Sequence, residues 1–160
     1  MKNNKKRLIF LILILLWMLM IFNFSNQTSE KSGGLSKQVT DVVLKVVRKQ
    51  NTTTNSQKKE LEHIIRKCAH FSIYFLGGII IYNLITTYPI NLPKRILLTQ
   101  GLGTLYACTD EFHQLFTPGR GASIKDVVID SSGILLSLIV IILFKKIKST
   151  NIPTNISKSF

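Results

Sequence analysis

The sequence predicts an all-α membrane protein that crosses the bilayer several times, and three observations lead to this fold class. First, 46% of the 160 residues are hydrophobic and the mean hydropathy is +0.25. Second, the apolar residues are gathered into long blocks, which is the pattern of membrane spans. Third, the formal net charge is +13, and the lysines lie mostly between the blocks, as they do in loops that face anionic headgroups. At this length the chain has room for a single domain, residues 1–160.

The same charge pattern argues against a nucleic-acid-binding protein. The basic residues are not interleaved with aromatic stacking positions, and the apolar blocks could not be accommodated in water. Cys68 and Cys108 are the only two cysteines, and they lack metal-ligand spacing. A bridge between them is geometrically conceivable, but buried free thiols are the favoured interpretation.

The first span is predicted over residues 8–24, which follow a cationic start and contain only Asn23 as an interruption. A basic start before an apolar core is also typical of a signal peptide. The exit lacks a small-x-small cleavage site, so we interpret the segment as an uncleaved span. The positive-inside rule then places the N-terminus in the cytoplasm.

An amphipathic helix outside the membrane is expected between spans one and two. Its apolar positions follow helical spacing and are Leu35, Val39, Val42, Val43 and Val46. Two interpretations remain open at this stage. The valine face packs on the spans, or the helix lies on anionic lipid at the membrane surface.

The second span is predicted over residues 69–86. Lys67, His70 and Tyr74 share one face of this helix because they are spaced i, i+3 and i+7. A histidine at a helix entrance is as consistent with a satisfied interfacial residue as with a functional one. Gly77 and Gly78 are small enough to allow close helix approach.

The third and fourth spans are predicted over residues 96–114 and 127–144. On the third span, small and polar residues form a stripe that should pack on other spans: Gln100, Gly103, Ala107, Asp110 or Glu111, and Gln114. Ser123 and Asp126 form a capping-box-like start to the fourth helix. Asp130 lies a full turn inside the apolar region.

The distribution of cations predicts that both termini are cytoplasmic. Lysine and arginine are concentrated in residues 1–7, in the loop around residue 94 and in the tail after residue 144, whereas the short outer loop contains only Arg120 and Lys125. The long first outer segment is also rich in lysine and fits the rule poorly. The agreement between the two ends favours four spans in a multi-pass protein of the cell membrane.

In this topology, the entrance of span two, the exit of span three and the start of span four meet at the outer face. The polar residues gathered there are His70, Tyr74, Asp110, Glu111, Gln114, Arg120, Ser123, Asp126 and Asp130. Charges at the edge of hydrocarbon are costly and usually pair with one another or bind a ligand. The cluster is therefore either a ligand site or an ion-pair network that clasps three helix ends.

At these residues the sequence resembles the VanZ-like family of small bacterial membrane proteins. Residues 66–74 (RKCAHFSIY) resemble its Lys-x-x-His-Phe-x-x-Tyr element, and residues 110–120 (DEFHQLFTPGR) resemble Asp-Glu-x-x-Gln-x-Phe-x-x-x-Arg. Residues 123–133 resemble the closing Ser-x-x-Asp-x-x-x-Asn-x-x-Gly, with Asp130 in place of the commoner Asn. Residues 22–27 (FNFSNQ) match the exit from the first span. The likeness covers roughly residues 10–143.

The resemblance implies a role at the cell surface in susceptibility to the glycopeptide teicoplanin, without supplying a reaction. The favoured hypothesis is a site that binds a lipid-linked cell-wall precursor or the drug, with membrane lipids as the other partners and no nucleic acid. The alternative is a membrane-embedded enzyme acting on a lipid-linked or cell-wall substrate. Its candidate acid–base residues are His70, Asp110, Glu111 and Asp126. A structural or assembly role for the cluster is the third hypothesis.

No cofactor is expected, and no metal is assigned. A metal site is a minor alternative, because Asp110 and His113 are spaced i, i+3 on a helix and His70 with further carboxylates could complete the ligand set. His113 lies outside the family pattern and is given less weight than His70.

Overall fold

The chain is entirely helical over the residues that the computed structural model describes, which are 2–26, 29–46, 54–118 and 121–150. Five helices occur within these ranges: α1 (Lys2–Ser25), α2 (Ser29–Val46), α3 (Asn55–Ile85), α4 (Leu92–Gln114) and α5 (Ile124–Thr150). No strand occurs in them. The all-α prediction is confirmed.

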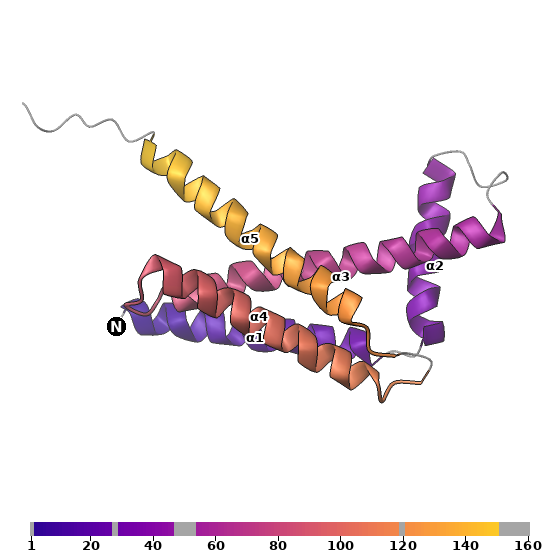
Figure 1. Ribbon diagram of the computed structural model, residues 1–160, viewed down its shortest axis with the longest axis horizontal. Coiled ribbons are helices and arrows are strands. Elements are labelled where there is room, and N and C mark those ends of the chain that lie inside the picture. The colour runs from indigo at the N-terminus through magenta and orange to yellow at the C-terminus, as the bar shows by residue number, and fades with distance from the viewer. Residues whose placement is uncertain (1, 27–28, 47–53, 119–120, 151–160) are drawn as a thin grey trace, which may run out of the picture.

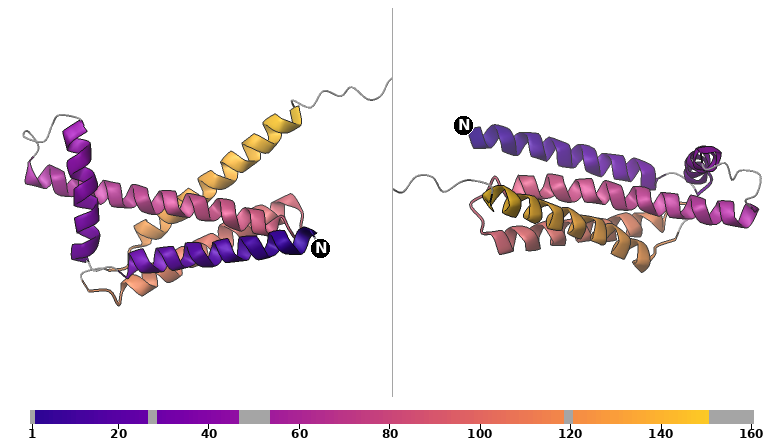
Figure 2. Two further views of the ribbon diagram at one scale, coloured as in Figure 1. Left: turned by 180° about the vertical axis from the view of Figure 1, so that it is seen from behind. Right: turned by 90° about the horizontal axis from the view of Figure 1, so that it is seen from above.

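Three helices run alongside one another and form a bundle. In Figure 1, α1, α3 and α4 share one general direction, α5 crosses α3 obliquely, and α2 lies across the far part of α3. Figure 2 shows the same arrangement from behind and from above, and α1 contacts both α3 and α4. Helix α3 is central, because it contacts each of the other four helices.

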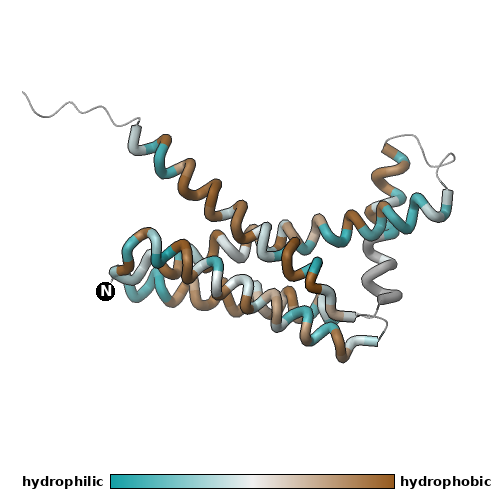
Figure 3. The backbone as a smooth tube through the Cα atoms, in the orientation of Figure 1, coloured by the Kyte–Doolittle hydropathy of each residue, from teal (hydrophilic) through white to brown (hydrophobic). Residues whose placement is uncertain are grey.

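Three helices are long and apolar enough to cross a membrane: residues Asn3–Ser25 of α1, all of α3 and all of α5. Their brown stretches in Figure 3 mark the apolar segments. Most large apolar side chains of α1 are exposed on the molecule, including Leu8, Leu15 and Leu16, as expected for a surface that faces lipid. Helix α4 falls short of this composition because polar residues such as Gln100 and Asp110 interrupt it.

The predicted polar stripe of α4 is confirmed as its packing face. Gly103, Ala107, Asp110, Glu111 and Gln114 are all buried. The Gln100 side chain is half-buried, and its Nε2 donates a hydrogen bond to the backbone carbonyl of Ser131 on α5 (3.2 Å). This face therefore points into the bundle.

Glycines allow the helices to approach closely, as predicted for Gly77 and Gly78. A Cβ at Gly77 would collide with the Trp17 ring of α1, and one at Gly78 would collide with Ser137 of α5. The tightest backbone approach is at Gly133, where a Cβ would lie 2.5 Å from the carbonyl oxygen of Phe71. Because that neighbour is backbone, it cannot rotate away.

Aromatic residues fill the centre of the bundle and attach α1 to it. The Trp17 ring lies edge-on to Tyr74 (centroids 5.6 Å apart) and its Nε1 donates to the Ile73 carbonyl (2.9 Å). The Tyr106 hydroxyl donates to the Met18 carbonyl (2.8 Å). These bonds give the polar atoms of the aromatic rings partners within the apolar core.

One end of the bundle joins the start of α1, the α3–α4 connection and the last turns of α5. The Arg7 guanidinium lies over the Tyr88 ring, 4.0 Å from its centroid, and donates to the Thr87 carbonyl (3.4 Å). On α5, Lys145 donates to the Tyr82 hydroxyl (2.8 Å). We call these contacts of Arg7 and Lys145 the basic end.

Helix α2 packs on α3 by a different face from the expected one. Thr40 and Leu44 are buried, whereas Val39 and Val46 are 49% and 77% exposed. The interpretation that the valine face packs on the spans is wrong. Val39, Val42 and Val46 lie about 100° or more around the helix axis from Thr40 and Leu44 at the periodicity of an α-helix.

Two smaller expectations are also corrected. Cys68 and Cys108 are free but exposed, not buried, because they lie on outward faces of α3 and α4. Helix α3 begins at Asn55, well before the predicted start of the second span at residue 69. Thr54 and Gln57 form a Thr-x-x-Gln capping box that fixes this earlier start.

Candidate functional site

A polar cavity of about 200 Å³ opens at the end of the bundle opposite the basic end. It lies where α3, the last turn of α4 and the first turns of α5 meet, as the sequence predicted. Helix α3 lines it with His63, Arg66, Lys67 and His70, and α5 with Asp126, Ile129 and Asp130. Glu111 and Gln114 come from α4, and Gly121 comes from the connection between α4 and α5.

The rim of the cavity carries two basic residues, Arg66 and Lys67, and the carboxylate of Asp126. Lys67 forms an ion pair with Asp126, which joins α3 to the start of α5. Arg66 precedes Lys67 on α3, and one of its Nη atoms lies 3.4 Å from Nδ1 of His63, one turn earlier on the same helix. Lys67 is therefore paired with a carboxylate, whereas Arg66 contacts the imidazole ring of His63.

Glu111 joins α4 to the beginning of α5. Its Oε2 accepts a hydrogen bond from the backbone N–H of Ser123 (2.8 Å), and its Oε1 accepts from Gln114 Nε2 (3.2 Å). Although Glu111 is only 4% exposed, both of its oxygens have partners. A buried carboxylate that accepts a backbone N–H at a helix start is a stabilising arrangement.

These bonds correct the predicted capping box. In a capping box the side chain three residues into the helix accepts the N–H of the capping residue. The Ser123 N–H is instead donated to Glu111, and Asp126 turns to Lys67. The helix does start at the expected place, with Ile124 as its first residue.

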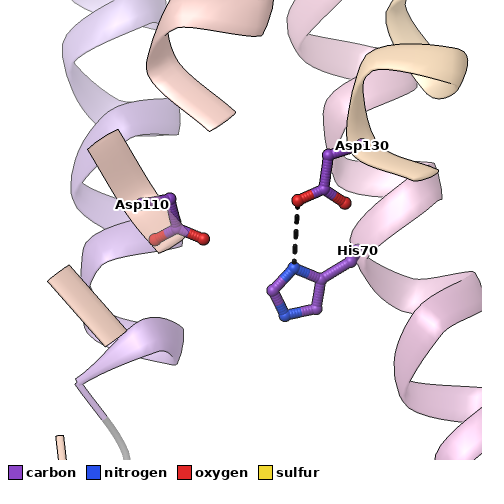
Figure 4. Close-up of side chains that lie close together, drawn as sticks. All are labelled: His70, Asp110 and Asp130. Carbon is purple, nitrogen blue, oxygen red and sulfur yellow. Dashed lines mark ion pairs between the residues drawn. The ribbon is translucent and has the colours of Figure 1, made fainter. Parts of the chain in front are cut away.

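A second group of ionisable side chains lies deeper in the bundle. His70 Nδ1 of α3 lies 3.7 Å from Asp130 Oδ2 of α5. Asp110 of α4 faces the same space, as Figure 4 shows. Ligand atoms of the three side chains all lie within 4.8 Å of one another. Asp110 and Asp130 are only 5% and 1% exposed.

The polar cluster therefore divides into two parts with different consequences. The ion pair of Lys67 with Asp126 and the bond from Ser123 to Glu111 join helix ends, so they form the clasp that the sequence left as an alternative. His70, Asp110 and Asp130, which we call the inner triad, lie deeper, where the contact of His70 with Asp130 also links α3 to α5. Buried carboxylates are expensive near hydrocarbon and mark functional sites.

The remaining predicted residues are not all part of the cavity. Tyr74 is fully buried and packs on Trp17 and Tyr106, with its hydroxyl within electrostatic range of Asp110 and Asp130. Ser123 contributes its backbone N–H. Arg120 lies outside the described residues. The minor metal alternative through His113 has no geometric support, because that ring stacks on Phe22 of α1 (centroids 4.7 Å apart).

Sequence reasoning missed two rim residues, His63 and Arg66, as parts of the site, and it noted Lys67 without assigning it. The signal was present in the spacing. His63, Arg66 or Lys67, and His70 recur at three- and four-residue steps, so they lie on one face of a helix. The expected start of the span at residue 69 separated this face from the site.

Three apolar helices and a polar cavity with buried acids, a histidine and basic residues at one end of the bundle indicate a helical membrane protein with a candidate site at that end. A family model described as VanZ/LLP1 matches residues 10–145, which is most of the chain. The chain belongs to the VanZ/LLP1 family. No curated protein and no solved structure gives a significant match.

Proposed function

We propose that this VanZ-family protein spans the cell membrane four times, with both termini in the cytoplasm and the cavity at the outer face. The alignment of α4 with α1 and α3 supports a fourth span, because its polar residues face the bundle. Arg7 and Lys145 support a cytoplasmic basic end. The exposed valines of α2 support a helix that lies on the outer lipid surface.

The proposed activity of the cavity is to bind the phosphate or pyrophosphate of a lipid-linked cell-wall precursor. Through this binding the protein modulates susceptibility to glycopeptides such as teicoplanin. The observation that carries the proposal is the small cavity with the Arg66 guanidinium at its rim, beside Lys67, which is paired with Asp126. A guanidinium offers paired N–H donors that match phosphate oxygens.

The volume of the cavity favours a precursor headgroup over the drug itself. Pockets for drug-sized ligands measure about 300–1,000 Å³, and glycopeptides are larger than ordinary drugs. A cavity of about 200 Å³ accommodates a phosphate group with part of its attached sugar or lipid. Occupied precursor would then be less available to a glycopeptide.

The test in cells uses teicoplanin susceptibility in a strain that lacks the gene. The strain is complemented with wild type, Arg66→Gln or the matched control Arg7→Gln from the basic end. We expect wild type and Arg7→Gln to restore tolerance and Arg66→Gln to fail at equal membrane abundance. Unchanged susceptibility after deletion would contradict the glycopeptide role.

The test in vitro measures binding directly. Purified protein in nanodiscs is titrated with a lipid-linked pyrophosphate and, as the control ligand, the corresponding neutral lipid alcohol. Saturable binding of the pyrophosphate alone, weakened at least about tenfold by Arg66→Gln, is the expected result. Equal binding of the neutral lipid would show that the cavity does not recognise phosphate.

An enzymatic function is the second candidate, and it is favoured by the pairing of His70 with Asp130 (3.7 Å). A histidine oriented by a carboxylate is a suitable general base toward water at a lipid-linked substrate, and Glu111 is the candidate acid, since Asp126 is paired with Lys67. Phosphate release from the pyrophosphate lipid decides between the two candidates. Release that is lost in His70→Gln while binding persists indicates an enzyme, and binding without release indicates a binding protein.

A further inference from the structure

The inner triad draws one donor group from each of three helices. His70 of α3, Asp110 of α4 and Asp130 of α5 point toward a common space in Figure 4. Each offers a ligand atom within 4.8 Å of the others. Because α4 and α5 are joined to each other and to α3 by the Glu111 and Lys67 bonds, the donors are held on rigid elements and not on loops.

The carboxylate of Asp130 is the feature that calls for a ligand. It is 99% buried, and neither of its oxygens accepts a hydrogen bond from any described residue. Asp110 is also buried and accepts a hydrogen bond from Gln114 of its own helix (3.2 Å). Among the described residues no lysine or arginine forms an ion pair with either aspartate. Buried charges of this kind are normally paired or coordinate a metal.

We propose that the inner triad binds a divalent transition-metal cation, Zn²⁺ or Mn²⁺. Two carboxylates and one imidazole form a mixed oxygen and nitrogen donor set, which suits these ions better than Ca²⁺ or Cu⁺. The two negative charges of the aspartates match the charge of the cation. Three protein ligands leave at least one coordination position open toward the cavity.

The spacing of the donors is compatible with coordination after a small adjustment. At metal–ligand distances of about 2.1 Å, tetrahedral ligand atoms lie roughly 3.4 Å apart. The separation of 3.7 Å between His70 Nδ1 and Asp130 Oδ2 is close to this value. The widest pair, at no more than 4.8 Å, has to close by at most about 1.4 Å, which side-chain rotation provides.

The proposal of a metal site is independent of the proposed function, because cation binding can be measured without any wall precursor. Protein in nanodiscs is stripped with a chelator and titrated with Zn²⁺ by calorimetry and with Mn²⁺ by electron paramagnetic resonance. The variants are Asp130→Asn and His70→Gln. The matched control is Glu60→Gln, which changes an exposed carboxylate on α3, the helix that carries His70.

We expect one equivalent of metal per chain, with affinity weakened at least about tenfold by either triad variant and unchanged by the control. Circular dichroism and size-exclusion profiles verify that each variant is folded. If a variant does not fold, the stoichiometry of metal binding to the wild type still tests the proposal. Absence of saturable binding up to about 1 mM metal would overturn the proposal. Equal weakening by Glu60→Gln would overturn it as well, because the binding would then be unspecific attraction to acidic groups.

Discussion

The two ends of the helical bundle treat charged residues in opposite ways. At the basic end, Arg7 lies over Tyr88 and Lys145 contacts Tyr82, so each cation remains near the surface beside an aromatic ring. At the cavity end, Asp110 and Asp130 are buried within the bundle. The free-energy cost of desolvating a charge is therefore small at the basic end and large at the cavity end.

This difference separates residues that stabilise the fold from residues that serve a site. Long basic side chains at a membrane boundary keep their charge in water and pack their stems on apolar surface. The burial of Asp130 is offset only in part by the His70 ring, which lies 3.7 Å from one of its oxygens among the described residues. The cavity end should therefore respond to substitution in ways that the basic end does not.

The largest effect is expected for Gly133→Ala, which acts on the packing beneath the inner triad. The new Cβ would meet the Phe71 backbone at 2.5 Å and push α5 away from α3. We expect a loss of about 3 kcal/mol in the free energy of unfolding, at the upper end of the range for overpacked cores. Thermal unfolding in detergent measures it.

Gly101→Ala is the matched control for that substitution. The position is on α4 and has no atom within 4 Å of its added Cβ. This variant should be as stable as wild type or slightly more stable, because alanine favours helix over glycine. Equal destabilisation by both variants would mean that the close approach at Gly133 is not important.

Glu111→Ala should have the next largest effect, because it removes the acceptor that joins α4 to α5. The Ser123 N–H would lose its partner, at a cost of about 1–3 kcal/mol. Glu111→Gln keeps a carbonyl oxygen as acceptor and should retain most of the stability. If the two variants unfold at the same temperature, the hydrogen bond contributes nothing to the clasp.

A gain in stability is expected when both inner carboxylates are neutralised. In metal-free protein, the double variant Asp110→Asn, Asp130→Asn should be more stable than wild type by about 1–2 kcal/mol, because two poorly solvated charges are removed. Chemical denaturation in the presence of a chelator measures the change. A clear loss of stability would place these aspartates among the structural residues of the clasp.

The smallest effect is expected at the basic end. Arg7→Gln removes the contact with the Tyr88 ring, which is worth about 0.5–1 kcal/mol at an exposed site. The substitution should leave metal affinity and precursor binding unchanged. A change in either one would show that the two ends are coupled through α1 or α3, and the contrast between them would then be less sharp.

Patterns within single helices predicted most of the fold. Apolar blocks gave the all-α class and the positions of the long helices, and the small-residue stripe of α4 gave its buried face. The face that α2 packs on α3 could not be predicted, because Thr40 and Leu44 are less apolar as a group than the valines. Helix packing depends on the shape of the partner as well as on periodicity.

The location of the polar cavity was predicted from the sequence, but the contacts within it were not. Motif spacing brought His70, Glu111, Asp126 and Asp130 to one end of the bundle. The partner of each carboxylate depends on how α3, α4 and α5 are rotated relative to one another. The sequence pattern of a single helix does not determine these rotations. The assignment of Asp126 to Lys67 and of the Ser123 N–H to Glu111 therefore required three-dimensional structure.

The length of α3 has a consequence for how a ligand would reach the cavity. Its 31 residues extend about 46 Å, well beyond the roughly 30 Å of a bilayer core. In Figure 1 its first turns project past the ends of α1, α4 and α5. In the proposed orientation, Arg66 would stand at the height of the lipid phosphates. For a ligand anchored in the bilayer, the encounter is then a two-dimensional search along the membrane surface.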